Sequence, residues 1–181
     1  MTRFKEKYQK TAVPALTEEF KYTNPHQVPR IVKVVVSAGV GRAVSDAKHL
    51  DAAAETLARI TGQRPVTTIA RKSIATFKVR EGNKVGTTVT LRGARAEEFL
   101  DLLVSVVLPR IRYFHGISDT AFDARGNYSL GLPEHGIFPQ IPFEEIGTPH
   151  GLQVNVVTTA QTPAEGKRLL QLMGFPMRRN A

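Results

Sequence analysis

VGTTVTLR, residues 85–92, shows the clearest alternation of side-chain character in the chain. Side chains alternate between the two faces of a strand, so one face holds Thr87, Val89 and Leu91 and the other holds Thr88, Thr90 and Arg92. A strand of this kind buries its apolar face and leaves the polar face open. The stretch therefore predicts a sheet that is covered on one side only.

An earlier strand repeats the pattern. RIVKVVVS, residues 30–37, is rich in β-branched side chains and lies between Pro29 and Gly39. Its valines at 32, 34 and 36 share the apolar face, while Lys33 and Ser37 lie on the mixed face. We expect further strands at residues 65–70 and 152–159, and only short elements in the Gly- and Pro-rich residues 113–151.

Two internal helices are predicted to cover the apolar face. Residues 45–61 form the first, with Ser45 as N-cap and Gly62 as C-cap, and its buried stripe is Leu50, Ala53, Ala54, Leu57 and Ile60. Residues 94–111 form the second, which we expect to end at Pro109, and its inward side chains are Phe99, Leu102, Leu103 and Val106.

Terminal helices complete the fold. Residues 2–20 have helical spacing that Pro14 should break or kink, and Thr162 with Pro163 should cap and open a last helix. These elements predict an α+β fold, a mainly antiparallel sheet with helices on one face and the other face open for RNA. The length predicts a single domain over residues 1–181, with a long basic loop at 71–84 and a C-terminal extension.

The composition limits the class of protein. The 25 Lys and Arg residues exceed the 16 Asp and Glu residues, which gives a formal charge of +9, and cysteine is absent. No disulfide, thiolate metal site or thiol nucleophile is therefore available. We expect no membrane span, because no apolar run reaches about 18 residues, and no secretory signal at the basic N-terminus.

Most of the positive charge lies in the middle of the chain. Between Arg64 and Arg95 eight basic residues stand against one acid, Glu81, and this local excess of +7 indicates a polyanionic partner. The loop RKSIATFKVREGNK, residues 71–84, holds five of the eight and is long for a connection between two strands. We expect Phe77 to be an apolar anchor beneath this loop, with base stacking as the alternative.

Rival functions find weaker support. Histidines and carboxylates gather between residues 115 and 150, but they lack the spacing of a metal or acid–base site. We therefore expect no catalytic residue, metal or cofactor. The side chains in question are His115, Asp119, Asp123, Glu134, His135, Glu144, Glu145 and His150. Gly39 and Gly41 lack the third glycine of a dinucleotide loop, because Val44 holds its place. A free-standing single-stranded RNA binder is the remaining alternative, although the open strand positions carry no aromatic platform. A membrane-surface role lacks an amphipathic basic segment.

Several long stretches, in order, resemble the bacterial large-subunit ribosomal protein five family, which binds 5S rRNA. They are VPRIVKVVVSAGVG, TGQRPVTTIARKSIATFKVREGNKVGTTVTLRG, LPRIRYFHGI, FDARGNYSLGLPEHGIFPQIPFE and VVTTAQTPAEGKRLLQLMGFP. The resemblance implies a cytoplasmic, non-enzymatic constituent of the central protuberance of the large subunit. Its implied partners are 5S rRNA, 23S rRNA, the P-site tRNA, a small-subunit head protein and neighbouring large-subunit proteins, with no membrane.

The same resemblance implies three sets of contact residues. The sheet face and first helix would bind 5S rRNA, through Lys33, Ser37, Gln63, Thr90 and Arg92. The basic loop would reach the elbow of the P-site tRNA, through Arg71, Lys72, Ser73, Thr76, Lys78 and Arg80. The bridge to the small-subunit head would involve Arg112, His115 and Gly116. The family usually has Asn where this chain has Ser37 and an acid where it has Arg42, so Ser37 loses the two-ended contact of an amide.

Overall fold

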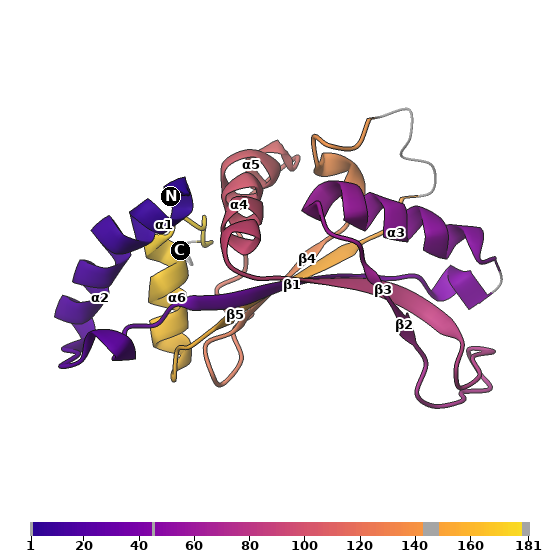
Figure 1. The fold of residues 1–181 in the computed structure, drawn as a ribbon, viewed down its shortest axis with the longest axis horizontal. Coiled ribbons are helices and arrows are strands. Elements are labelled where there is room, and N and C mark those ends of the chain that lie inside the picture. Colours follow the sequence, from indigo (N-terminus) through magenta and orange to yellow (C-terminus); the bar gives the residue numbers. More distant parts are fainter. Residues whose placement is uncertain (1, 45, 143–148, 179–181) are drawn as a thin grey trace. The chain divides into compact units, whose positions relative to one another are not determined.

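A computed structural model describes residues 2–44, 46–142 and 149–178 of the chain (Figure 1). Its strands form one five-stranded sheet in the order β2-β3-β1-β5-β4. Their bounds are β1 Ile31–Gly39, β2 Val66–Ile69, β3 Lys84–Leu91, β4 Tyr128–Leu132 and β5 Leu152–Thr158. The predicted α+β class with a mainly antiparallel sheet is confirmed.

The chain packs as two compact units. Unit 1 comprises Met1–Val34, Arg92–Leu130 and Asn155–Ala181, and unit 2 comprises Val35–Leu91 and Gly131–Val154. The single domain expected from the length stays a prediction.

Unit 1 contains the terminal helices and the helix that follows β3. The first helical stretch is α1 Arg3–Lys7, the π-helical turn η1 Tyr8–Ala12 and α2 Val13–Phe20, followed by the short 3₁₀ turn η2 Pro25–Gln27. The second is α4 Ala94–Leu102, the π-helical turn η4 Leu103–Val107 and α5 Leu108–Arg110; α6 is Pro163–Leu172. α1 packs on α4, and α2 and η1 pack on α6. The expected cap of α6 is confirmed, since Thr162 and Glu165 form a reciprocal capping box.

Both π-helical turns end two residues before a proline, Pro14 in one case and Pro109 in the other. Proline has no amide hydrogen, and its ring collides with the carbonyl four residues earlier in a regular α-helix. A wider turn at this point relieves the collision without ending the helix. The expected disturbance at Pro14 therefore takes the form of η1.

Two predictions for the helix after β3 are wrong: which of its side chains face the core, and where it ends. Val106 was expected to face the core and is 38% exposed, and Leu102 is only half-buried, whereas Leu100, Leu103 and Val107 are buried. Val106 lies inside η4, where the wider π-helical repeat turns its side chain away from the position that a regular α-helix would give it. The helix also passes Pro109 and ends at Arg110.

In unit 2, α3 Lys48–Thr61 lies across one face of β3 (Figure 1). Its buried side chains are Leu50, Ala53, Leu57 and Ile60, as expected, and Ala54 is half-buried. Gly62 ends the helix in the left-handed conformation, with φ +65°. The prediction of Ser45 as N-cap is wrong, because the helix begins at Lys48 and Ala47 stands at its N-cap; Ser45 itself lies outside the described residues. Two 3₁₀ turns, η3 Gly41–Val44 and η5 His135–Ile137, complete the unit.

None of the helices in the described ranges combines the length and the apolar character that crossing a bilayer requires.

Candidate nucleic-acid interface

The strands β1 and β3 each have one buried and one open face, as the alternation predicts. Along β1, Val34 and Val36 are fully buried as expected, but Val32 at the start of the strand is 39% exposed; Lys33 and Ser37 keep partial exposure. Along β3, Val89 and Leu91 are buried and Thr90 is exposed. The open faces thus present an ammonium group and hydroxyl groups, which suit phosphate and ribose oxygens.

Three of the five residues predicted to bind 5S rRNA belong to unit 2. Gln63 follows the C-cap of α3, and its Nε2 donates to the carbonyl oxygen of Thr90 at 3.2 Å, which fixes the Gln63 side chain beside Thr90. Ser37 lies on β1. The neighbouring strand β3 is hydrogen-bonded to β1 next to Ser37, where Thr88 Oγ1 donates to the Val36 carbonyl oxygen at 3.4 Å. Lys33 and Arg92 belong to unit 1, so the predicted set is divided between the two units.

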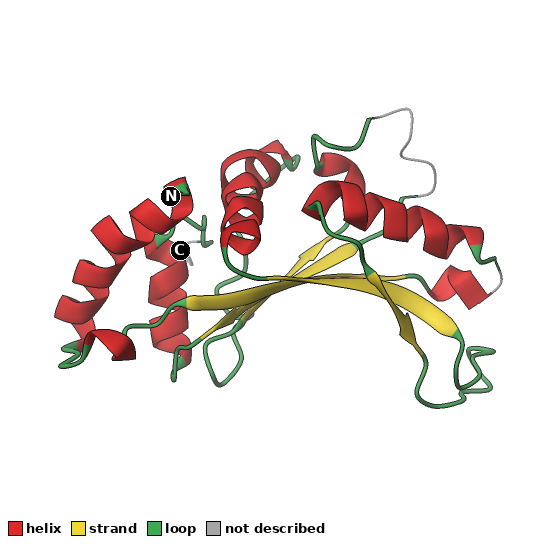
Figure 2. Cartoon of the chain, viewed as in Figure 1, coloured by secondary structure: helices red, strands yellow, loops and turns green. Residues whose placement is uncertain are grey.

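The loop between β2 and β3 is built by its own backbone bonds. It extends from the end of the strand pair on the side away from α3 (green in Figure 2). The β2–β3 pairing continues as Ala70 N donates to Asn83 O at 2.8 Å. Further out, Ile74 and Val79 exchange two bonds of 2.8 and 3.2 Å across a tight turn in which Lys78 has φ +53°. The tip is thus a second, smaller hairpin.

Six cations of the basic run belong to unit 2, five of them in the loop at residues 71–84 and the sixth, Arg64, before β2 at the other end of the strand pair. All six are exposed, and none forms an ion pair with another residue of the described ranges: Arg64, Arg71, Lys72, Lys78, Arg80 and Lys84. Exposed guanidinium and ammonium groups without acidic partners form a site for a polyanion. The remaining two members of the basic run, Arg92 and Arg95, belong to unit 1 and are also exposed.

The polar and aromatic residues of the loop have separate roles. Ser73 Oγ accepts from the amide of Glu81 at 2.9 Å, so it braces the base of the small hairpin and keeps its hydroxyl hydrogen for donation. Thr76 is exposed near the tip. Phe77 is 71% exposed, so the expectation that it anchors the loop from beneath is wrong. Its neighbours at the turn are too few to cover it, and the ring is open for stacking.

The predicted bridge residues lie in unit 1, after α5. Arg112 and His115 are exposed. Gly116 has φ +97°, and a Cβ there would lie 2.8 Å from the amide nitrogen of Arg178, so glycine lets the chain run closely against residues 176–178. Tyr113 was not singled out from the sequence, yet it is 91% exposed with φ +54°. No local pattern marked it, because a tyrosine in a turn-rich segment carries no periodic signal.

The sequence leaves the histidines and carboxylates between residues 115 and 150 as a weakly supported metal or acid–base site. Within the described ranges no three His, Asp or Glu side chains come together to hold a metal ion, and Glu144 and Glu145 lie outside those ranges. Asp119 accepts from Lys167 at 3.1 Å, and the rings of His135 and His150 stack with centroids 4.0 Å apart. Asp123 accepts from the amides of Arg125 and Asn127 at 2.9 and 2.8 Å, the local backbone bonding expected for a turn.

Comparison with known proteins identifies the relatives of the chain. Residues 24–80 match the family described as Ribosomal protein L5, and residues 84–177 match the C-terminal part of the same ribosomal protein family. The protein named large ribosomal subunit protein uL5 of Citrifermentans bemidjiense is 55% identical over 178 residues, which cover 98% of this chain and 99% of that protein. The proteins of the same name from Leuconostoc citreum and Rubrobacter xylanophilus are 55% and 52% identical, covering 95% and 99% of this chain and 96% and 100% of theirs.

Proposed function

The chain belongs to the ribosomal protein L5 family, and from this premise we propose that it binds 5S rRNA in the central protuberance of the large ribosomal subunit. As a member of that family it is a structural, non-enzymatic constituent of the ribosome, and its location is the ribosome in the cytoplasm. rRNA and other ribosomal components are its partners.

The open strand faces support the 5S rRNA contact. Lys33 and Arg92 in unit 1 neutralise phosphates, while Ser37, Gln63 and Thr90 in unit 2 donate to backbone oxygens. The described strand positions on these faces carry no aromatic side chain, which favours recognition of a folded RNA by its backbone and shape. A Ser hydroxyl at position 37 makes one such contact where an Asn amide would make two.

The small hairpin supports a separate contact with the P-site tRNA. The loop at residues 71–84 holds five exposed cations that have no ion-pair partner among the described residues, and this observation carries the proposal most directly. Arg71, Lys72, Lys78 and Arg80 bind phosphates, and Ser73 and Thr76 donate to backbone oxygens. An ordered tip loses less entropy on binding than a disordered loop would, so it can reach a moving tRNA at low cost.

The segment after α5 and the remaining basic surface make further contacts. Arg112, His115 and Gly116 lie in the segment that bridges to a protein of the small-subunit head, and the exposed Tyr113 is suited to the same contact. The chain contacts 23S rRNA and neighbouring large-subunit proteins through its remaining basic surface.

Replacing Arg71, Lys72, Lys78 and Arg80 by Ala tests whether the loop binds tRNA while the strand faces bind 5S rRNA. The variant should retain 5S rRNA binding and lose tRNA affinity at the P site of ribosomes assembled with it, because the four replaced cations are proposed to contact only tRNA. The matched control replaces four exposed cations that lie outside the loop and the proposed 5S rRNA surface and form no ion pair with another described residue, Lys21, Arg110, Arg125 and Arg178. Loss of 5S rRNA binding in the loop variant alone would contradict the assignment.

The alternative of a free-standing RNA binder is tested by the RNA that copurifies with the protein. The proposal predicts 5S rRNA and sedimentation with the large subunit. A mixed population of unrelated RNAs, with the protein outside ribosomal fractions, would favour the alternative.

A further inference from the structure

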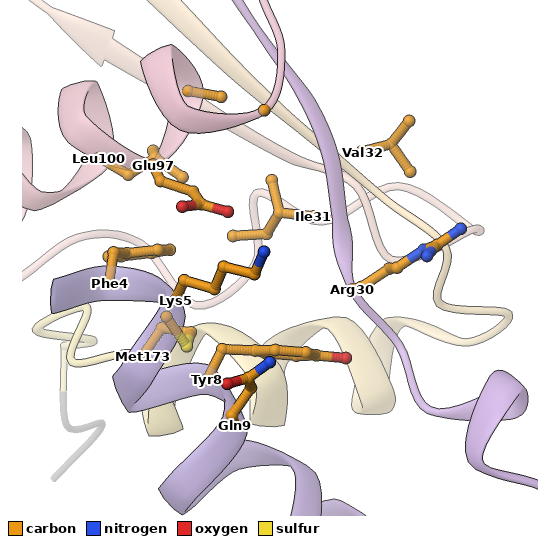
Figure 3. A pocket seen from close by; sticks show the side chains of 12 residues that line it. Phe4, Lys5, Tyr8, Gln9, Arg30, Ile31, Val32, Glu97, Leu100 and Met173 are labelled. Atoms are coloured by element: carbon orange, nitrogen blue, oxygen red, sulfur yellow. The ribbon is translucent and has the colours of Figure 1, made fainter. Parts of the chain in front are cut away.

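Unit 1 contains a cavity of about 400 Å³ between the first helical stretch, the start of β1 and the start of α4 (Figure 3). Phe4, Leu100 and Met173, which line it, are buried side chains and give it apolar walls. Val32, also part of the lining, is 39% exposed although it belongs to the apolar face of β1. A volume of this size is typical of a small-molecule or nucleotide site.

Two opposite charges enter this apolar space. In Figure 3 the Lys5 side chain extends into the space between Ile31 and Tyr8, and the carboxylate of Glu97 points to the same space. Glu97 accepts a hydrogen bond from the hydroxyl of Thr2, which leaves further lone pairs on its two oxygens. Among the described residues Lys5 has no ion-pair partner.

An aromatic ring is held in place at the same cavity. The Tyr8 hydroxyl donates to the carbonyl oxygen of Pro29 at 3.2 Å, which fixes the ring across the side opposite Glu97 (Figure 3). Burial raises the pKa of Tyr8, with Arg30 acting in the opposite direction, so the phenol stays neutral at physiological pH. Tyr8 belongs to the π-turn η1, and turns of this kind are frequent at functional sites.

The cavity adjoins the part of the proposed 5S rRNA surface that lies in unit 1. Ile31 lines the cavity and shares a strand face with Lys33, because side chains two residues apart point the same way. Gly93 lines it as well and directly follows Arg92. An RNA strand whose phosphates contact Lys33 and Arg92 therefore passes beside the opening.

We infer that this cavity holds one unpaired guanine base of the bound RNA, an inference that rests on the proposed RNA-binding function. The apolar walls and the Tyr8 ring pack on the base, as aromatic side chains do with splayed-out bases. Guanine presents two adjacent donors, N1–H and the N2 amino group, and a carboxylate accepts from both. Adenine and cytosine place an acceptor beside their amino group, and uracil has a single donor, so Glu97 selects guanine. Lys5 and Arg30 balance the phosphate charge at the cavity and its rim.

Crosslinking with RNA tests the inference in the intact protein. 5S rRNA transcribed with 6-thioguanosine should crosslink to the peptide that contains Lys5 and Tyr8. The variant Glu97→Gln should lose this crosslink and bind 5S rRNA roughly 5- to 100-fold more weakly, the range for one bidentate base contact. Glu98→Gln, a neutralised exposed carboxylate one residue further along α4, is the matched control and should bind as the original chain does.

Titration with GMP, followed by the amide NMR signals of the intact protein, gives an independent readout. GMP should shift the signals of Lys5, Tyr8 and Ile31 more than AMP, CMP or UMP, and Glu97→Gln should abolish the preference. If 5S rRNA binds without crosslinks in residues 3–9, and binds the original chain and the Glu97→Gln variant equally well, the cavity is not a guanine site and the proposed function stands. If no rRNA binds, the proposed function fails instead.

Discussion

At the scale of single residues, two glycines of unit 1 lie in close contact with one another. Gly166 lies in α6, and a Cβ there would lie 2.8 Å from the Cα of Gly126 and still closer to its carbonyl oxygen. Gly126 has φ +71° and accepts through that oxygen from Thr158 Oγ1 at 3.1 Å. Backbone atoms held by hydrogen bonds cannot move aside, so the helix can approach this turn only through glycine.

Replacing Gly166 by Ala therefore has the opposite effect to the usual one. Ala stabilises an open helix interior by about 1 kcal/mol relative to Gly, but here the added methyl group should lower the free energy of unfolding by about 1–3 kcal/mol. Thermal or urea unfolding measures the change. Gly131→Ala is the control, because a Cβ at Gly131 meets nothing within 4 Å. Equal stability of the two variants would contradict the packing.

Asp123 predicts an acid-dependent part of the stability. The hydrogen bond from the Asn127 side chain lowers the pKa of Asp123 below its ordinary value of 3.8, and the backbone amides of Asn127 and Arg125 act in the same direction, while burial opposes them. A pKa that is lower in the folded state stabilises the fold above the unfolded value, and this stabilisation is lost as the pH falls through the folded value.

The variant Asp123→Asn should accordingly be less stable than the original chain at neutral pH, and the difference should shrink below about pH 4. Urea unfolding between about pH 7 and pH 3 measures it, with the exposed Asp51→Asn as control. A difference that stays constant across this range would show that the carboxylate charge contributes nothing.

Residue-scale prediction from the sequence succeeded where side-chain alternation decides the environment. The faces of Lys33, Ser37 and Thr90 follow from the period of a strand. The exposure of Phe77 and Tyr113 did not follow, because both lie in turns, where position is set by the backbone path and not by a repeat.

At the scale of elements, the small hairpin between β2 and β3 is the feature that the loop's length alone did not reveal. Its two strands are single residues, Ile74 and Val79, and no alternation is visible over so short a span. The bond from the amide of Glu81 to Ser73 Oγ closes its base at 2.9 Å. The order of the tip depends on this bond and on the turn at Lys78.

Ser73→Ala should loosen the tip while the rest of the chain keeps its stability. Loss of a hydrogen bond worth about 1 kcal/mol should speed hydrogen exchange at the Glu81 amide by roughly fivefold. Thr76→Ala is the control, since its exposed side chain braces no backbone group described in the loop. Unchanged exchange at Glu81 in Ser73→Ala would show that the turn at Lys78 suffices.

Phe77→Ala should leave the folded stability within about 0.5 kcal/mol, because the ring is exposed. It should weaken tRNA binding at the P site by roughly 5- to 100-fold, the range for one stacked base. Tyr at this position should restore the affinity, because it retains a ring face. Full tRNA affinity in the Ala variant would limit the hairpin to phosphate contacts.

The helices illustrate the same limit of prediction. Caps were predicted correctly at Thr162 and Gly62, because capping depends on a few local residues. The inward side of the helix after β3 was wrong at Val106, because the π-turn before Pro109 shifts the repeat. A proline signals a disturbance, but not whether the chain bends, ends or widens.

At the scale of the whole molecule, the α+β class, the strand positions and the family followed from the sequence. The division into two units did not, because β1 and β5 pass from one unit to the other without a linker or a change in composition. The predicted 5S rRNA residues fall on both sides of this division. Ser37, Gln63 and Thr90 occupy one unit, and Lys33 and Arg92 the other.

The affinity for 5S rRNA as a function of salt tests the central claim most directly, that exposed cations and open strand faces bind this folded RNA. Filter-binding titrations should compare 5S rRNA with an unrelated structured RNA of equal length between about 50 and 200 mM salt. Affinity for 5S rRNA should fall about tenfold or more, as expected when three or more phosphates are neutralised, and should exceed that for the control RNA throughout. Equal affinity for the two RNAs at every salt concentration would contradict specific 5S rRNA binding and leave only general attraction to nucleic acid.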